Sequence, residues 1–294
     1  MATDKRLIII DCHSLLYRAF HALPPLTNKK GQPTGAVYGF LLTLFKAIKD
    51  LKANYIVACF DTEKPTFRHQ EFKEYKIHRP QTPEGIVSQI PIMKEVLESF
   101  KVPIFEKDGF EADDLIATIA NKVKGEAEVF ILSGDLDNLQ LVDEKIKVYT
   151  LGKGIKDSVL YDEEKVLERF GVKPSQMNDF KALTGDASDN VPGVPGIGKK
   201  TAAELIQKFG RIENLYSELA TDTAVLKPKI KEALKNNKQS AFLSLQLVQT
   251  KKDVPLDFDL ELCKFGNFDQ QKVKNVFYQL GFNSLVDRLS TIVF

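Results

Sequence analysis

Three short runs of consecutive apolar residues, each followed by an aspartate, mark the first half of the chain. The runs are residues 7–10, 55–60 and 129–132, and the aspartates are Asp11, Asp61 and Asp135. Continuous β-branched runs of this length predict strands that are buried on both faces. Because helical patterns separate the runs, their order predicts an α/β fold with a mainly parallel sheet. Ligands bind beyond the carboxyl ends of such strands, where these aspartates are expected to meet.

A further acidic cluster begins the helix that the pattern predicts after Gly109. Glu111, Asp113 and Asp114 precede an apolar stripe that runs to Val123. Acidic side chains in a first helical turn interact favourably with the helix dipole, so capping alone explains such a cluster. The alternative is that these acids join the strand-end aspartates around bound cations, which would offset the repulsion among so many carboxylates.

Residues 67–79 mix basic and aromatic side chains. Arg68, Lys73, Lys76 and Arg79 alternate with three aromatic residues, a composition suited to phosphates and stacked bases. A solvated, partly helical loop is the alternative interpretation. A helix opened by Thr82-Pro83 is expected to follow and to run to Phe100.

Strands become scarce after residue 172, and a smaller helical domain is predicted for residues 173–260. Its most specific feature is a loop at residues 191–202, in which three glycines and two prolines precede a helix that starts at Lys199. Such a loop presents free backbone N–H groups to a phosphate. Its spacing is neither that of a Walker A loop nor that of a Rossmann fingerprint, and a purely structural helix–turn–helix corner is the alternative. Residues 261–294 form a last helical segment, which we expect to pack back on the first domain (residues 1–172).

Composition adds few constraints. The chain has 294 residues, 43% of them hydrophobic and 28% charged, and its formal net charge of +1 gives no sign of a nucleic-acid partner. Its three cysteines lie in apolar runs without zinc-site spacing, which indicates reduced, buried thiols. No apolar run reaches the roughly 20 residues of a membrane span, and no signal-peptide pattern is present, so a cytoplasmic location without membrane attachment is expected.

The motifs, taken in order, resemble a known family: the 5′–3′ exonuclease (5′-nuclease, flap endonuclease) domain at the N-terminus of bacterial DNA polymerase I. The matching stretches cover almost the whole chain. They are Ile10-Asp11 with Tyr17-Arg18, residues 35–40, Phe60-Asp61 with Phe67-Arg68, Tyr75-Lys76 with Arg79, residues 111–114, residues 183–190 and the loop at 192–201. The resemblance implies a PIN-like 5′-nuclease fold with a helix-hairpin-type DNA-binding domain and an arch formed by residues 67–100.

The resemblance also implies roles for individual residues. A first divalent cation would be held by Asp11, Asp61, Glu111 and Asp113, with Asp114 beside them, and a second by Asp135, Asp137, Asp186 and Asp189. Oxygen-only ligands suit Mg²⁺, for which Mn²⁺ can substitute. The residues expected near the reacting phosphate are Tyr17, Arg18, Lys76 and Arg79. The residues expected to bind DNA are Arg68, Lys73, Gly193, Gly196, Ile197, Gly198, Lys199, Lys200 and Thr201, with K⁺ as a candidate ion at the 193–198 loop.

The function implied is a structure-specific 5′ nuclease that cuts flapped or nicked duplex DNA, and RNA primers on DNA, by two-metal-ion catalysis in replication and repair. A module that binds branched DNA without cutting it is one alternative, and a PIN-like ribonuclease is another. The complete acidic set argues against the first, and the basic–aromatic segment and glycine loop argue against the second. We expect a monomer, and the sequence leaves open both a stand-alone nuclease and a covalently attached polymerase.

Overall fold

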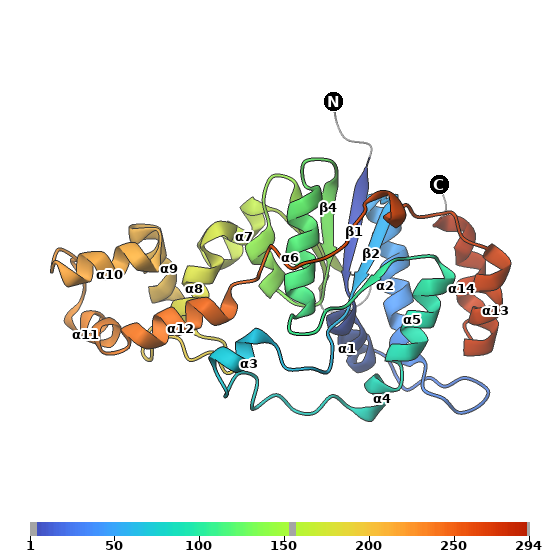
Figure 1. Ribbon diagram of the computed structural model, residues 1–294, viewed down its shortest axis with the longest axis horizontal. Helices are drawn as coiled ribbons and strands as arrows, with labels where there is room; N and C mark the ends of the chain where they lie inside the picture. The colour runs from blue at the N-terminus through green and yellow to red at the C-terminus, as the bar shows by residue number, and fades with distance from the viewer. Residues whose placement is uncertain (1–4, 153–156, 293–294) are drawn as a thin grey trace.

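A six-stranded sheet in the order β3-β2-β1-β4-β5-β6 forms the centre of the structure (Figure 1). The computed structural model describes residues 5–152 and 157–292. The strands are β1 (Arg6–Asp11), β2 (Tyr55–Cys59), β3 (Ile104–Phe105), β4 (Glu128–Leu132), β5 (Ile146–Leu151) and β6 (Ser158–Tyr161). All pair in parallel except β6, which is antiparallel to β5. The predicted α/β fold with a mainly parallel sheet is confirmed.

The two faces of the sheet are covered by different helices because alternate strand residues point in opposite directions. Ile8 and Ile10 pack in a core with α1 (Cys12–Ala22), α2 (Gly35–Leu51) and α5 (Ile90–Ser99). Leu7 and Ile9 pack in a second core with α6 (Ala112–Val123). Between β2 and α5 lie two short helices, α3 (Phe67–Glu71) and α4 (Glu84–Val87).

The second half of the chain is mainly helical. Its elements are α7 (Glu163–Phe170), α8 (Met177–Thr184), α9 (Lys199–Phe209), α10 (Ile212–Ala220), α11 (Pro228–Asn236), α12 (Lys238–Val248), α13 (Gln270–Leu280) and α14 (Asn283–Val286), with the 3₁₀ turns η1 (Asp137–Leu141), η2 (Pro174–Gln176), η3 (Glu261–Cys263) and η4 (Asp287–Thr291). Helices α8 to α12 extend from the α6 side of the sheet, whereas α13 and α14 lie at the opposite end of the molecule (Figure 1). Phe277 of α13 packs near Phe45 of α2 and near Phe100, which directly follows α5, with ring centroids 6.4 and 5.9 Å apart.

The helical region shares its core with one face of the sheet. Leu183 of α8, Phe209 of α9 and Leu215 of α10 belong to the same buried apolar cluster as Leu7 and Val129 of the sheet. The domain limits at residues 172 and 260 stay predictions, and residues 1–4, 153–156 and 293–294 of the predicted segments lie outside the described residues.

The helix predicted from Thr82 to Phe100 is wrong in one respect, because two helices, α4 and α5, occupy that stretch. Pro91 stands in the first turn of α5, where its missing N–H is tolerated but could not continue a helix from α4. The side chain of Gln89, between the two helices, donates to Gly85 O and accepts from the N–H groups of Ala36 and Val37, so it caps the start of α2.

Within the described part of the chain, no helix is both long enough and apolar enough to cross a membrane.

Candidate active site

The carboxyl ends of β1 and β4 meet because the two strands are adjacent and parallel, with Ile10 opposite Leu132. Asp11, at the end of β1, is 5% exposed and accepts a hydrogen bond from Ser133 Oγ at 2.6 Å. It also accepts from Ser14 N–H at 3.2 Å and so caps α1. Ser133, directly after β4, and Ser14, in the first turn of α1, therefore both orient this carboxylate.

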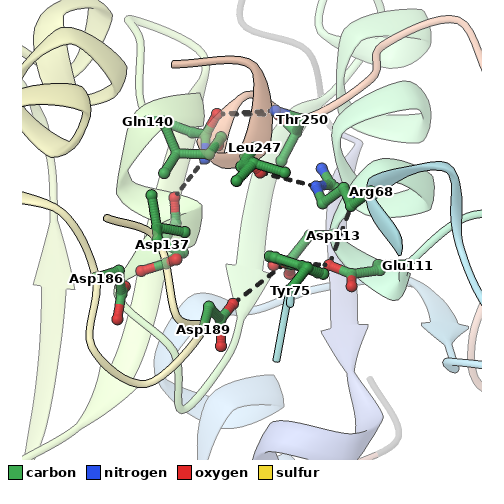
Figure 2. Close-up of a pocket in the computed structure, with 12 residues that line it drawn as sticks. Arg68, Tyr75, Glu111, Asp113, Asp137, Gln140, Asp186, Asp189, Leu247 and Thr250 are labelled. Carbon is green, nitrogen blue, oxygen red and sulfur yellow. Dashed lines mark hydrogen bonds and ion pairs between the residues drawn. The ribbon is translucent and has the colours of Figure 1, made fainter. Parts of the chain in front are cut away.

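Figure 2 shows a pocket in which side chains from five segments converge. Its lining comprises Arg68, Tyr75, Glu111, Asp113, Asp137, Gln140, Asp186, Asp189, Val191, Leu247, Val248 and Thr250. Five of these residues are acids that the sequence predicted as metal ligands. The fold thus brings together carboxylates that are up to 78 positions apart in the sequence, from Glu111 to Asp189.

Several of these carboxyl groups resist ionisation in the protein. The pKa of Asp113 lies well above its ordinary value, first because the group is buried and then because Asp11, Asp135 and Asp137 lie near it. Burial, with Asp61 and Asp135, raises the pKa of Asp11 to about 6, although the bonds from Ser133 and Ser14 oppose the rise. Burial and Asp135 raise the pKa of Asp137 to about 7 despite Lys181. The pocket is consequently a place where added positive charge is stabilised.

Besides Arg68, whose Nη1 lies 3.5 Å from Glu111 Oε2, three basic side chains already contact this acidic group. Lys76 Nζ lies 2.7 Å from Glu111 Oε1 and 3.7 Å from Asp189 Oδ2. Arg79 Nη2 lies 3.0 Å from Asp189 Oδ1. Lys76 and Arg79, two of the predicted basic residues of the 67–79 segment, therefore contact predicted metal ligands.

The third basic residue is Lys181 of α8, which sequence analysis did not identify. Its Nζ lies 2.9 Å from Asp186 Oδ2 and also pairs with Asp137 Oδ1. Burial alone would raise the pKa of Asp186, but Lys181 and Ser188 lower it to about 2. Its position in the motif Lys181-Ala182-Leu183 gave no sign of this role, because a lysine in a last helical turn is common.

The donor set fits a hard divalent cation, since it consists of carboxylate oxygens, several of them held at raised pKa by their neighbours. In residues 5–152 and 157–292, however, no three His, Cys, Asp or Glu side chains already lie close enough to hold an ion. Lys76, Arg79 and Lys181 occupy oxygens of Glu111, Asp189, Asp137 and Asp186. The ligand assignments therefore stay predictions.

Asp114, predicted beside the first ligand set, is engaged differently from the pocket acids, and its role as a ligand stays a prediction. It is fully buried and forms a two-pronged ion pair with Arg68, with distances of 2.8 and 2.9 Å. It also accepts from the backbone N–H groups of Lys251 (2.8 Å) and Glu111 (3.1 Å). All of its accepting directions are thus used within the fold.

Arg68, which was predicted to bind DNA, is only 2% exposed, and that role stays a prediction. Besides pairing with Asp114, it donates to Leu247 O (2.9 Å) and Gln249 O (3.0 Å) at the end of α12. It therefore joins α3 to α6 and to the helical region. Lys73, by contrast, is exposed.

Asp61 and Asp135 border the same strand ends. Asp61 Oδ1 accepts from Ala112 N–H at the start of α6 (2.8 Å), and its Oδ2 lies 3.5 Å from His13 Nδ1. His13, which the sequence analysis also missed, accepts from Asp61 N–H at 3.1 Å. Asp135 Oδ1 accepts from Asp137 N–H at 2.9 Å. A histidine two positions after the strand-end Asp11 was the available signal for His13.

Tyr17 and Arg18 lie on α1, which starts at the end of β1. The Tyr17 side chain is 44% exposed and its ring stacks near that of His21 (4.6 Å between centroids). Arg18 donates to the carbonyl groups of Leu151 and Gly152 at the end of β5. These contacts place both residues beside the strand ends. Within the part of the chain that the structure describes, Arg18 forms no ion pair with a predicted metal ligand.

The glycine loop divides into buried and exposed parts, and two of the predicted DNA contacts, Gly193 and Ile197, lie in the buried part. Gly193 N–H donates to Ser244 Oγ and Gly193 O accepts from Ser240 Oγ, so its backbone is occupied by α12. A Cβ on Gly193 would lie 2.3 Å from Gly185 N, so close packing requires this glycine. The side chain of Ile197 is 4% exposed and its N–H donates to Val194 O.

The exposed part of the loop keeps the predicted features. A Cβ added to Gly196 or Gly198 would meet no other atom within 4 Å, and Gly198 is the N-cap of α9. Lys199 and Lys200 are exposed, and Thr201 is partly exposed. The first turn of α9 thus offers N–H groups and two ammonium groups on one open surface.

The raised carboxyl pKa values predict how stability in EDTA depends on pH. Between the ordinary value of 3.8 and about 7, folded Asp137 holds more protons than unfolded Asp137, so its contribution to stability falls as pH rises. Asp11 acts in the same direction up to about 6, whereas the lowered pKa of His13 acts in the opposite one. Urea unfolding at pH 4.5 and 7.0 measures how the free energy of unfolding changes with pH. Its slope against pH should be less negative in Asp137→Asn than in the wild type. Equal slopes would contradict the burial of this carboxyl group.

Acidic strand ends that face basic side chains over a mainly parallel sheet define the class of this protein as an α/β nuclease. The chain belongs to the 5′–3′ exonuclease family. Its residues 6–171 match the N-terminal resolvase-like domain of the 5′–3′ exonucleases, and residues 172–271 match their C-terminal SAM fold. The resemblance identified from the sequence is confirmed.

The chain is also similar in sequence to bacterial DNA polymerases I. The chain is 41% identical over 288 residues to DNA polymerase I of Bacillus caldotenax, and 40% identical over 290 residues to that of Bacillus subtilis. Each match covers 98% of this chain but only 32% and 33% of the polymerase. The chain therefore spans about a third of the length of these relatives and is homologous to their N-terminal region.

Solved structures show the same fold. The T5 5′-exonuclease with bound zinc has a TM-score of 0.68 at 23% identity, with 98% of each chain covered. A bacteriophage T5 flap endonuclease in a pseudo-enzyme–product complex with DNA and metal ions has a TM-score of 0.68 at 20% identity, again with 98% of each chain covered.

Proposed function

We propose that this protein is a structure-specific 5′ nuclease that hydrolyses phosphodiester bonds near the branch point of 5′-flapped or nicked duplex DNA. Its substrates include RNA-primed DNA, which places it in replication and repair. The observation that carries the proposal is the pocket in which Glu111, Asp113, Asp137, Asp186 and Asp189 face Lys76 and Arg79. Family membership and the metal- and DNA-bound T5 relatives support it.

The acids are proposed to hold two divalent cations, Mg²⁺ or Mn²⁺. Asp11, Asp61, Glu111 and Asp113 form the first ligand set, and Asp135, Asp137, Asp186 and Asp189 form the second. When bound, the cations supply activation of a water molecule and neutralisation of charge on the leaving oxygen. The protein holds the carboxylates in place: Ser133 and Ser14 orient Asp11, Asn138 donates to Asp113 Oδ1 at 3.0 Å, and Ala112 N–H orients Asp61.

Lys76 and Arg79 are proposed to bind the scissile phosphate. Both side chains now contact Asp189, and a phosphate at the pocket entrance would offer them further charged acceptors. Their positive charge would then stabilise the negative charge that develops on the phosphate oxygens. Tyr17 and Arg18, beside the end of β1, are proposed to contact the strand that is cut, and exposed Lys73 a neighbouring phosphate.

The exposed start of α9 is proposed to bind the backbone of the duplex away from the cut. Gly196, Gly198 and Thr201 offer backbone groups there, with K⁺ as a candidate ion at the 193–198 loop. Replacing Lys200 with alanine should weaken binding to all duplex sequences alike and reduce the salt slope of log Kd by about one. Fluorescence anisotropy in EDTA from 50 to 200 mM salt measures both quantities. A loss confined to certain sequences would contradict a contact to the backbone.

The proposed function is tested with a 5′-labelled flap on a nicked duplex, beside single-stranded DNA and single-stranded RNA of the same sequence, in Mg²⁺ or in EDTA. Mg²⁺-dependent cutting within a few nucleotides of the branch point, with little cutting of either single strand, is expected. Binding of the flap without cutting would favour a non-catalytic branched-DNA module. Preferential cutting of the RNA would favour a ribonuclease.

A further inference from the structure

Lys181 connects the two halves of the proposed second cation site. Asp137 starts η1, which follows strand β4, whereas Asp186 follows α8 in the helical region. Lys181 Nζ lies 2.9 Å from Asp186 Oδ2 and also pairs with Asp137 Oδ1. The lysine side chain is only 15% exposed. None of the motifs that identified the site includes this residue.

We propose that Lys181 is a positioning residue that supplies the positive charge between Asp137 and Asp186 while no second cation is bound, and that it competes with this cation for the same carboxylate oxygens. This inference rests on the proposed function, because it takes the second ligand set as given.

The other basic residues of the pocket do not fill this position. Lys76 and Arg79 pair with Glu111 and Asp189, on the side of the pocket toward α3. In the described residues, the ion pairs of Asp137 and Asp186 are both made with Lys181. Removing this ammonium group would leave two partly buried carboxylates near Asp135 without a counter-charge.

The local fold explains why a lysine can fill this position. Lys181 lies in the last turn of α8, where carbonyl groups carry partial negative charge and favour a cation. The carbonyl of Lys181 accepts a hydrogen bond from Gly185 N–H. Gly185 has a φ of 70°, so the helix ends there and Asp186 is the first residue after the turn. An ammonium group on a flexible four-carbon chain can also withdraw, which a bidentate guanidinium would do less readily.

Competition predicts opposite effects on cation binding and on stability. Without Lys181, a cation would meet free carboxylate oxygens and bind more tightly. The cation-free protein would meanwhile be less stable, because Asp137 and Asp186 would repel each other. A lysine that served only as a DNA contact would change neither quantity in this way.

The test is a titration of the full chain with Mn²⁺ alone by isothermal titration calorimetry, combined with thermal unfolding in EDTA and in Mn²⁺. The variants are Lys181→Met, which keeps chain length, and Lys181→Arg, which keeps charge. Lys29→Met, at an exposed lysine far from the pocket in sequence, is the control. We expect the Mn²⁺ ion that binds more weakly to the wild type to bind Lys181→Met with a Kd about tenfold lower, which is the effect of removing one close competing charge. Lys29→Met should stay within about twofold of the wild type, and Lys181→Arg, whose guanidinium withdraws less readily, should bind Mn²⁺ no more tightly than the wild type.

Thermal unfolding provides the second readout. Lys181→Met should have a lower Tm than the wild type in EDTA and a larger increase in Tm when Mn²⁺ is added. A variant that is unfolded in EDTA but folds with Mn²⁺ would support the inference equally. Unchanged or weaker Mn²⁺ binding by Lys181→Met, or a failure to fold even with Mn²⁺, would overturn it.

The failure of this inference is distinguishable from the failure of the proposed function. If wild-type protein bound fewer than two Mn²⁺ ions and did not cut the flap, the second ligand set itself would be wrong. If the wild type bound two ions and cut the flap while Lys181→Met kept wild-type affinity, only the role of Lys181 would be wrong.

Discussion

Replacing Asp113 with asparagine is expected to reduce cutting of a 5′-flapped duplex by at least about a hundredfold and, in the same variant, to raise stability in EDTA. Asp113 lies partly buried among other carboxylates, and burial and those neighbours hold its pKa well above the ordinary value. Its ionised form therefore opposes folding at neutral pH unless a cation is present. An asparagine keeps the shape and the contact with Asn138 but removes the charge that a divalent cation would need.

The measurement combines flap cutting in Mg²⁺ with urea unfolding in EDTA at pH 7. Asp253→Asn, which changes an exposed aspartate outside the pocket, is the matched control and should alter neither result. A variant that lost activity because it was misfolded would show lower stability, so the expected combination separates the two causes. Near wild-type cutting by Asp113→Asn would contradict the first ligand set.

Replacing Arg68 with methionine is expected to lower the free energy of unfolding by about 3–5 kcal/mol, because it leaves Asp114 as an uncompensated buried charge. The side chains of Arg68 and Asp114 are 3% and 0% exposed, so water cannot solvate the remaining carboxylate. The loss would also free the carbonyl groups of Leu247 and Gln249. Urea unfolding at pH 7 measures the effect.

Two further variants make this prediction specific. The double variant Arg68→Met/Asp114→Leu removes both charges and should recover a large part of the lost stability. Lys64→Met breaks an ion pair of similar length, 2.6 Å to Asp108, but with side chains that are 69% and 55% exposed. It should change stability by less than about 1 kcal/mol. A cost in Arg68→Met no larger than in Lys64→Met would show that the buried pair is not a structural anchor.

The sequence predicted the parts of the fold that depend on local pattern. Buried strands that end in Asp11, Asp61 and Asp135, and helices between them, are visible in residue order alone. The strands β5 and β6 were missed because neither is a continuous apolar run: Lys147 and Thr150 interrupt β5, and β6 has only four residues, of which the first is Ser158. The two-residue strand β3 is too short to produce any period.

The site shows a similar limit. Motif order identified the acids, but a motif does not say which way a first-turn side chain points. Asp114 lies one position after Asp113 and therefore about 100° around the helix, which turns it toward Arg68 and the end of α12. Ile197 and Gly193 likewise belong to the predicted loop but face inward. These differences depend on tertiary neighbours that no local pattern records.

The long connection between β2 and α5 differs from the rest of the molecule in how little of it is buried. In residues 61–88, the side chains of Thr66, Arg68, Tyr75 and Ile86 are buried, and most others are partly or fully exposed. The sheet and helical region, in contrast, share one continuous core. Beyond the anchors at Arg68 and Tyr75, opening residues 77–85 would therefore expose little apolar surface, and their amide hydrogens should exchange with solvent long before those of β1 or α6. Under the proposed function, a DNA end bound there would contact a segment that can change its conformation locally, whereas the sheet and the helical region share one core and are expected to stay folded.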